Sequence, residues 1–155
     1  MYAEKIKSLI AVRQVLNNLC DDTILELEKT LGKDWKKKAF QIIRAIKKER
    51  YIIKLKENHK PVGLFGLIPL GEKVGGIFLL TSDELHKGNL ITFLKSARKQ
   101  IDNWCNDYEL IMDSLYKENQ TIKKWLQLLR FKPSTFEDEN FQVWYRGNIN
   151  LFKGR

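Results

Sequence analysis

The segments Val62-Gly-Leu-Phe-Gly-Leu-Ile-Pro69 and Gly75-Gly-Ile-Phe-Leu-Leu-Thr81 together decide the fold. Each is a short apolar run, and a turn at 70–73 separates them, which is typical of two neighbouring strands. The preceding Tyr51-Ile-Ile-Lys-Leu-Lys56 alternates apolar and polar residues, as a half-buried strand does. Three consecutive strands joined by short turns predict an antiparallel β-meander.

The residues before the meander show helical spacing instead. Apolar side chains over 6–19 predict a first helix. A second helix is expected to start at a capping box formed by Thr23 and Glu26 and to stop at Gly32. Asp34 is expected to cap a third helix. This third helix should turn its apolar side chains inward: Trp35, Ala39, Ile42, Ile43 and Ile46.

The residues after the meander alternate between helix and strand. We predict a helix over Asn89–Asn106, a buried strand at Leu110–Met112, a helix beginning near Asn119, and a closing strand pair over 131–137 and 141–145. A helix between two strands favours a right-handed crossover, which makes those strands parallel neighbours. The order of elements predicts an α+β fold with one mixed sheet of about six to seven strands and helices on both faces.

Length and composition agree with one folded domain over residues 1–155. Apolar residues make up 43% of the chain and charged residues 30%, which excludes disorder and low complexity. The longest apolar run, Val62–Leu70, contains glycine and proline and is too short to cross a bilayer. The first residues lack the apolar core of a secretory signal, so we expect a protein that is not secreted.

Cysteine and histidine are scarce. Cys20 and Cys105 lie far apart in the sequence and are expected to be buried, reduced thiols. The chain has two histidines and no Cys-x-x-Cys motif, so we expect no metal site.

The charge is concentrated in the N-terminal part. The formal net charge is +9, and residues 1–60 contain 15 basic and 8 acidic side chains. Such a field favours anionic partners. Seven of these 15 basic side chains lie on one face of the third helix or directly beside its ends: Lys33, Lys36, Lys37, Lys38, Arg44, Lys47 and Lys48. This face is interpreted either as a nucleic-acid or acidic-protein surface or as an ordinary solvated helix face.

Four segments, in this order and spacing, resemble a known family: Lys60-Pro-Val-Gly-Leu-Phe-Gly66, Gly76-Ile-Phe-Leu-Leu-Thr-Ser-Asp83, Phe93-Leu-Lys-Ser-Ala-Arg98 and Asn119-Gln-Thr-Ile-Lys-Lys-Trp-Leu-Gln-Leu-Leu-Arg-Phe131. Together with the order of elements they resemble the GNAT fold of the Gcn-five-related N-acetyltransferases. More narrowly, they resemble the small phage protein family of internal virion protein A from short-tailed phages. The narrower resemblance implies a phage or prophage protein located in the virion or the host cytoplasm, with a virion or host protein as partner.

The resemblance to GNAT enzymes implies acetyl-CoA as cofactor and transfer of its acetyl group to an amine. In those enzymes the backbone of one strand pairs with pantetheine, and the next helix N-terminus receives the pyrophosphate. Here these places fall on the strand Ile77–Thr81 and on a phosphate turn at residues 86–89. The implied cofactor-binding residues are Phe78, Leu79, Leu80, Thr81, His86, Lys87, Gly88, Asn89 and Asn119.

The sequence departs from the enzyme pattern at several positions. The usual Arg/Gln-x-x-Gly-x-Gly/Ala turn is replaced by a segment with one glycine, preceded by Asp83 and Glu84. Leu126 takes the place of the tyrosine that often acts as general acid, and Arg130 that of a glycine. A leucine cannot protonate a thiolate. Tyr116 is interpreted either as a substitute acid or as a side chain that packs the end of the sheet.

Two roles stay open for two further residues. His86 is either a contact to phosphate or a base, or it is a surface histidine without a role. Asn119 is either a helix cap or a cofactor contact. The sequence therefore leaves two functions: an N-acetyltransferase, or a non-catalytic binding module that engages a partner through the basic helical face.

Overall fold

The computed structural model describes residues 1–87 and 90–153. The strands are β1 (Tyr2–Lys5), β2 (Arg50–Lys54), β3 (Pro61–Pro69), β4 (Val74–Thr81), β5 (Leu110–Tyr116), β6 (Lys132–Glu137) and β7 (Phe141–Gly147). The helices are α1 (Leu9–Leu16), α2 (Asp21–Leu31), α3 (Trp35–Ala45), α4 (Asp83–Lys87), α5 (Leu90–Asp107), α6 (Gln120–Leu128) and α7 (Asn150–Lys153).

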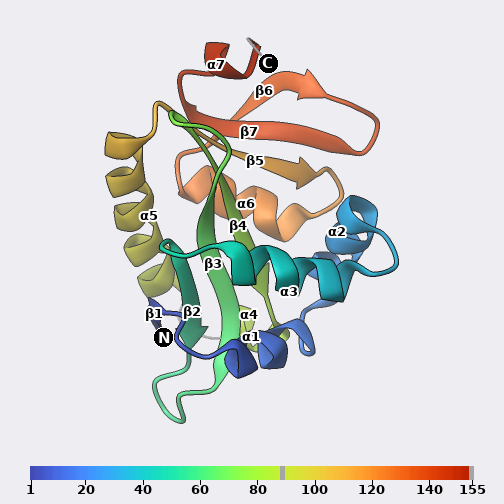
Figure 1. Cartoon of the computed structure of the whole chain (residues 1–155), viewed down its shortest axis with the longest axis vertical. Helices are drawn as coiled ribbons and strands as arrows, with labels where there is room; N and C mark the ends of the chain where they lie inside the picture. The colour runs from blue at the N-terminus through green and yellow to red at the C-terminus, as the bar shows by residue number, and fades with distance from the viewer. Residues whose placement is uncertain (88–89, 154–155) are drawn as a thin grey trace. The chain divides into compact units, whose positions relative to one another are not determined.

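The strands form one mixed sheet in the order β1-β2-β3-β4-β5-β7-β6, and helices flank it (Figure 1). The meander is antiparallel, with Ile52 opposite Leu64 between β2 and β3. β4 and β5 are parallel, and their ladder runs from Val74–Leu110 to Gly76–Met112. The helix α5 connects these two strands, so the predicted crossover and the predicted mixed sheet are confirmed.

The chain divides into two compact units. The first comprises Met1–Leu67 and Phe78–Phe93, and the second comprises Ile68–Ile77 and Leu94–Arg155. The single domain over residues 1–155 stays a prediction.

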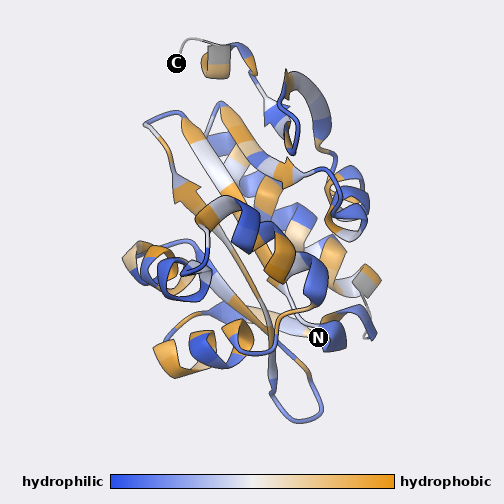
Figure 2. Cartoon of the chain, turned by 90° about the vertical axis from the view of Figure 1, so that its right-hand side faces the viewer, coloured by the Kyte–Doolittle hydropathy of each residue, from blue (hydrophilic) through white to orange (hydrophobic). Residues whose placement is uncertain are grey.

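The core of the first unit lies where α1 and α3 pack on the meander strands. The helices of the chain carry both hydrophobic and hydrophilic residues (Figure 2), and α1 and α3 each bury the apolar ones on one face. The buried residues of this core are Ile6, Val12, Val15, Leu16, Leu19, Ala39, Ile43, Ile52, Leu64 and Leu80. This packing gives α1 and α3 fixed positions, which matters for the surface that they present to solvent.

The start of the chain differs from the prediction of a helix over residues 6–19. Residues 2–5 form β1, which pairs antiparallel with β2, and the Ile6 N–H donates to the Arg50 carbonyl over 3.1 Å. Helix α1 begins only after Ser8, whose side-chain oxygen accepts from the Ile10 N–H. Residues 2–5, for which no element was predicted, pair with the edge of β2, which offers them unpaired backbone groups.

Two details of the second and third helices also differ. Helix α2 begins at Asp21, so Thr23 lies inside its first turn and does not form the predicted capping box. Gly32 does end α2, with a φ of +86°. On α3, Ile42 is 39% exposed, whereas Ala39 and Ile43 are buried. Ala39 and Ile43 stand four residues apart on one face, and Ile42 falls outside that face.

The second unit contains the rest of the predicted elements. Helix α6 buries Ile122, Trp125 and Leu126. The closing strands β6 and β7 pair antiparallel as predicted. The short helices α4 and α7 were not predicted, because one or two helical turns carry too little periodicity to detect. Among the described residues, no helix combines the length and the apolar character that a bilayer crossing requires.

Candidate functional site

Backbone hydrogen bonds join the end of β4 to the connection between α1 and α2. The Cys20 N–H donates to the Thr81 carbonyl oxygen over 2.9 Å, and Leu19 forms an antiparallel bridge with Ser82. On the other side, the Ser82 N–H and hydroxyl both donate to the Val62 carbonyl, over 3.1 and 2.7 Å. The Cys20–Thr81 hydrogen bond and the Leu19–Ser82 bridge place the side chains of Cys20 and Thr81 next to each other inside the first unit.

The short helix α4 starts directly after β4 and turns His86 back toward Thr81. The distance from His86 Nε2 to Thr81 Oγ1 is 3.1 Å, within hydrogen-bonding range. His86 is half-buried and belongs to a helix, so the prediction of a surface loop histidine is wrong.

Four polar side chains meet here, which we call the Cys20 cluster: Cys20, Thr23, Thr81 and His86. The Cys20 Sγ lies 3.2 Å from Thr23 Oγ1, 3.4 Å from Thr81 Oγ1 and 3.8 Å from His86 Nε2. The two threonine hydroxyls are 3.2 Å apart. Thr81 and Thr23 are 1% and 2% exposed, so the hydroxyls satisfy each other and the thiol away from water.

The surroundings of Cys20 change the acidity of its thiol. Burial alone would raise the pKa, but hydrogen bonds from His86, Thr23 and Thr81 to the sulfur favour the thiolate more strongly. The net effect lowers the pKa of Cys20 from 9.0 to about 7. Cys105 shows the opposite behaviour, because burial raises the pKa of its thiol. Both cysteines are free, as predicted, but only Cys20 is a candidate for thiolate chemistry.

Sequence analysis missed Cys20 and Thr23 as members of a site. The sequence predicts Thr23 as part of a capping box and Cys20 as a buried, reduced thiol. The contacts from Cys20 to Thr81 and His86 join residues 61 and 66 positions apart. No local pattern carries such a signal.

The predicted cofactor strand forms the last part of β4. Phe78 and Leu79 are half-buried, whereas Leu80 and Thr81 are buried. The ladder of β4 with β5 accounts for Val74, Gly75 and Gly76, and β4 continues to Thr81. The Thr81 carbonyl is used by Cys20, so its backbone is not wholly available to a ligand.

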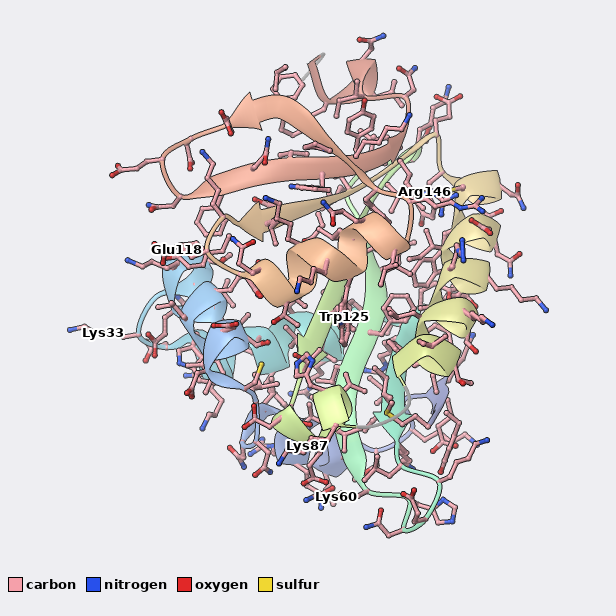
Figure 3. All side chains as sticks on the ribbon, turned by 180° about the vertical axis from the view of Figure 1, so that it is seen from behind. Lys33, Lys60, Lys87, Glu118, Trp125 and Arg146 are labelled. Atoms are coloured by element: carbon pink, nitrogen blue, oxygen red, sulfur yellow. The ribbon has the colours of Figure 1, made fainter. Side chains whose placement is uncertain are left out.

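The predicted phosphate turn falls partly on α4. His86 belongs to the Cys20 cluster, and Lys87 is exposed at the last residue of the helix (Figure 3). Gly88 and Asn89 lie outside the described residues. The adjacent Glu84 forms an ion pair with Lys60. This pair reduces the repulsion that the acidic residues before the turn would exert on a phosphate.

The other predicted residues lie in the second unit. The Tyr116 hydroxyl donates to Glu118 Oε2 over 2.8 Å, and this bond raises the pKa of the tyrosine. Asn119 is 1% exposed, and its Oδ1 accepts from the Ile122 N–H over 3.3 Å, so the interpretation as a helix cap is confirmed. Leu126 is 2% exposed. A buried leucine offers no proton to a thiolate.

No group of three or more acidic, histidine or cysteine side chains in the described part of the chain could hold a metal ion. The chemistry available at the end of β4 is therefore that of a thiol, an imidazole and two hydroxyls.

Comparison with known proteins gives the class of fold. No protein-family model matches the chain, and no curated protein matches it significantly in sequence. Solved structures do match. PH1933 from Pyrococcus horikoshii has a TM-score of 0.67 and 17% identity, and the match covers 95% of this chain and 98% of that one. A GNAT-family acetyltransferase from Bacillus anthracis has a TM-score of 0.61 and 12% identity, with 94% and 95% covered.

A third similar structure is the spermidine N-acetyltransferase from Vibrio cholerae in complex with CoA and spermine. Its TM-score is 0.64 at 12% identity, with 94% of each chain covered. These likenesses confirm the predicted GNAT fold. The narrower resemblance to the phage virion family stays a prediction.

Proposed function

We propose that the protein binds acetyl-CoA and transfers the acetyl group to an amine. The observation that carries this proposal is the GNAT fold over nearly the whole chain, shared with acetyltransferases. The Cys20 cluster adds to it, because it places titratable side chains at the end of β4. Bound acetyl-CoA would supply the acetyl group as a thioester.

The residues that would hold the cofactor belong to the first unit. The backbone of Phe78, Leu79 and Leu80 continues β4 beyond its ladder with β5 and would bind the pantetheine. Lys87 is an exposed cation at the end of α4 and would bind phosphate. The Lys60–Glu84 ion pair supports this fit, since it masks one of the two acidic side chains near Lys87.

His86 is the side chain that we assign to proton transfer. An ammonium group must lose a proton before its nitrogen can attack a thioester, and imidazole is the commonest general base for this step. His86 would accept that proton, while the Thr81 hydroxyl orients its ring. Leu126 offers no acid for the departing thiolate, which would take its proton from water. Holding the reactants together supplies the remaining part of the acceleration.

Binding is tested by isothermal titration of acetyl-CoA into the purified protein. We expect binding that weakens in Lys87→Glu, because that substitution replaces an attractive charge near the phosphates with a repulsive one. Lys47→Glu is the matched control, since it makes the same change in net charge at another exposed lysine of the first unit. No binding at millimolar acetyl-CoA would remove the proposal. If both variants weakened acetyl-CoA binding equally, Lys87 would contribute only through the net charge of the protein.

Activity is tested by release of free CoA thiol with a panel of amines and amine-bearing peptides. His86→Ala should lower the turnover by roughly 10²- to 10⁴-fold, the usual contribution of a general base. Cys20→Ser should keep most of the activity, because it leaves the imidazole in place. Acetyl-CoA binding without turnover for any amine would favour the alternative, a non-catalytic module of GNAT fold. Association with a phage virion or a host protein stays a prediction in either case.

A further inference from the structure

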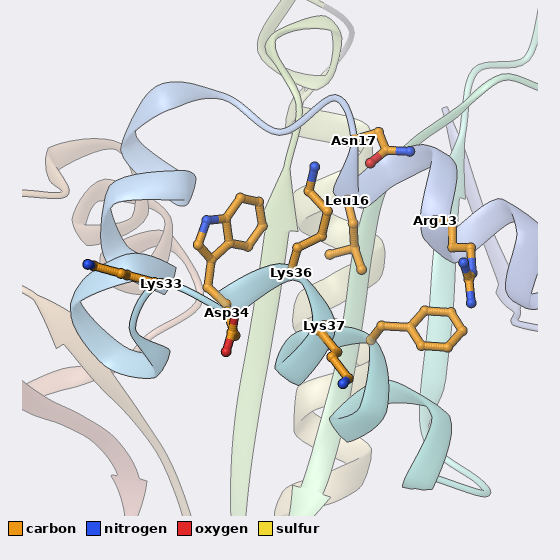
Figure 4. Close-up of a pocket in the computed structure, with 9 residues that line it drawn as sticks. Arg13, Leu16, Asn17, Lys33, Asp34, Lys36 and Lys37 are labelled. Carbon is orange, nitrogen blue, oxygen red and sulfur yellow. The ribbon is translucent and has the colours of Figure 1, made fainter.

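A pocket of about 590 Å³ opens between α1 and the start of α3 in the first unit. Arg13, Leu16 and Asn17 line it from α1, and residues 33–37 line it from the α2–α3 connection and the first turn of α3 (Figure 4). The volume lies within the range of sites that hold small ligands. Leu16 is 2% exposed and belongs to the core of the first unit, so its side of the pocket is held by packing.

The pocket is strongly basic. Its lining contains four exposed cationic side chains: Arg13, Lys33, Lys36 and Lys37. Asp34 is the one acidic side chain among the described residues that line it. Within residues 1–87 and 90–153, none of the four cations forms an ion pair. The pocket therefore carries an excess of about three positive charges that no protein carboxylate neutralises, and it favours an anion with more than one charge.

Two of the four cationic side chains lie over aromatic rings. The Arg13 guanidinium lies 4.4 Å from the centre of the Phe40 ring, and the Lys36 Nζ lies 5.5 Å from the centre of the Trp35 ring. Both rings line the pocket and are half-buried. A guanidinium is planar, and one that lies over an aromatic ring can still donate to a phosphate through its N–H groups. Indole and guanidinium planes are the surfaces on which nucleobases stack.

We propose that this pocket is a binding site for a nucleoside phosphate. The phosphates would bind the lysine side chains of the first turn of α3 and the edge of Arg13, and the base would stack on the planar surfaces of Trp35 and Arg13. This goes beyond the proposed acetyl transfer, because it assigns a ligand to residues other than those of β4 and α4. The same chemistry occurs in a free nucleotide and in a nucleotide within a nucleic-acid strand. The pocket has the volume of a site for one small ligand, so we assign the free nucleotide.

The test is isothermal titration of ATP into the full chain at low salt, without divalent cations. We expect binding that weakens by at least about tenfold in the double variant Lys36→Glu/Lys37→Glu, since each lysine would lose a charge-assisted hydrogen bond. Lys47→Glu/Lys48→Glu is the matched control: it makes the same change in charge at exposed residues after α3 and should change the affinity less than about threefold. Asp34→Asn should tighten binding, because it removes the acidic side chain.

Three further ligands test the assignment. Tripolyphosphate should bind more weakly than ATP, and adenosine more weakly still. Lys87→Glu, the variant that should weaken acetyl-CoA at the end of α4, should leave the ATP affinity unchanged, which separates this pocket from the proposed acetyl-CoA site. The proposal is overturned if ATP does not bind at millimolar concentration, if both double variants weaken it equally, or if tripolyphosphate binds as tightly as ATP. It is also overturned if Lys87→Glu weakens ATP as much as it weakens acetyl-CoA, or if a short oligonucleotide binds and ATP does not.

Discussion

The N–H of Cys20 and the carbonyl oxygen of Thr81 are joined by a 2.9 Å hydrogen bond. This bond fixes the connection between α1 and α2 to the last residue of β4. It also brings the Cys20 thiol within 3.4 Å of the Thr81 hydroxyl and within 3.8 Å of His86 Nε2. Two segments that are far apart in the chain thereby share one set of titratable side chains, and several consequences can be measured.

The first prediction concerns the acidity of Cys20. Its rate of alkylation by iodoacetamide should rise with pH around a midpoint near 7, the lowered pKa of its thiol. In His86→Ala the midpoint should move upward, because the thiolate loses the hydrogen bond from the imidazole. Alkylation is followed by mass spectrometry of the peptides that contain Cys20 and Cys105.

Lys87→Ala is the control for that measurement, since it removes an exposed side chain next to His86 on the same helix. Its midpoint should equal that of the unsubstituted protein. Cys105 provides an internal reference with a midpoint above 9, because burial raises the pKa of its thiol. A midpoint near 9 for Cys20 in the unsubstituted protein would show that His86 and the threonines do not stabilise the thiolate.

The second prediction concerns stability and pH. A pKa of about 7 in the folded protein, against an ordinary value of 9.0, means that the unfolded chain binds the proton more tightly. The stabilisation is present above pH 9 and is lost as the pH falls through 7. Its size corresponds to about 2–3 kcal/mol in the free energy of unfolding.

Urea unfolding from pH 6 to pH 9.5 measures this effect. Both proteins compared should carry Cys105→Ser, and one should also carry Cys20→Ser. The protein that retains Cys20 should gain stability relative to the other between pH 7 and pH 9. Parallel pH profiles for the two proteins would contradict the lowered pKa.

The third prediction concerns the close packing of β3. A Cβ at Gly66 would lie 2.5 Å from the Glu49 carbonyl oxygen and 2.6 Å from the Phe78 ring. Backbone cannot move aside at that distance, so Gly66→Ala should lower the free energy of unfolding by about 1–3 kcal/mol or more. Gly76→Ala is the control, because its Cβ would meet the Leu70 side chain at 3.1 Å, and Leu70 is 42% exposed and can turn away. Equal stability of the two variants in urea would contradict this account.

The fourth prediction separates the two roles that the sequence left open for Asn119. Asn119→Ala should lower the stability by about 1 kcal/mol, since the Ile122 N–H loses its acceptor. Asn119→Ser keeps a capping oxygen and should recover much of that loss. Acetyl-CoA affinity should be the same in both variants if the residue acts as a cap. A fall in affinity without a fall in stability would instead assign Asn119 to the cofactor.

Local patterns were sufficient for most of the architecture. The β-meander, the helix between the parallel strands and the closing hairpin are each confirmed, because alternation and helical spacing report directly which face of a segment is buried. Gly32 ends α2 as predicted, because its φ of +86° suits a residue without a side chain. Three elements were not predicted: β1, which forms through pairing of residues 2–5 with the edge of β2, and the short helices α4 and α7.

The candidate site depended far less on local pattern. The sequence identified His86 and Thr81 only through a family resemblance, and it predicted Cys20 only as a buried, reduced thiol. The basic residues Lys33, Lys36 and Lys37 were recognised as a charged face, but their place in a pocket with Arg13 and Phe40 was not. Periodicity tells which side of a helix is buried. It does not tell which other helix lies beside it.

The sequence by itself therefore determined the identity and order of most strands and helices, all except β1, α4 and α7, since each depends on spacing within ten or twenty residues. Only the tertiary structure decided that the Cys20 thiol meets His86 and that Arg13 covers the Phe40 ring beside three lysines. These contacts depend on how helices and strands pack against one another. These contacts join residues that are distant in the chain, and the local pattern around one such residue does not depend on the identity of the other.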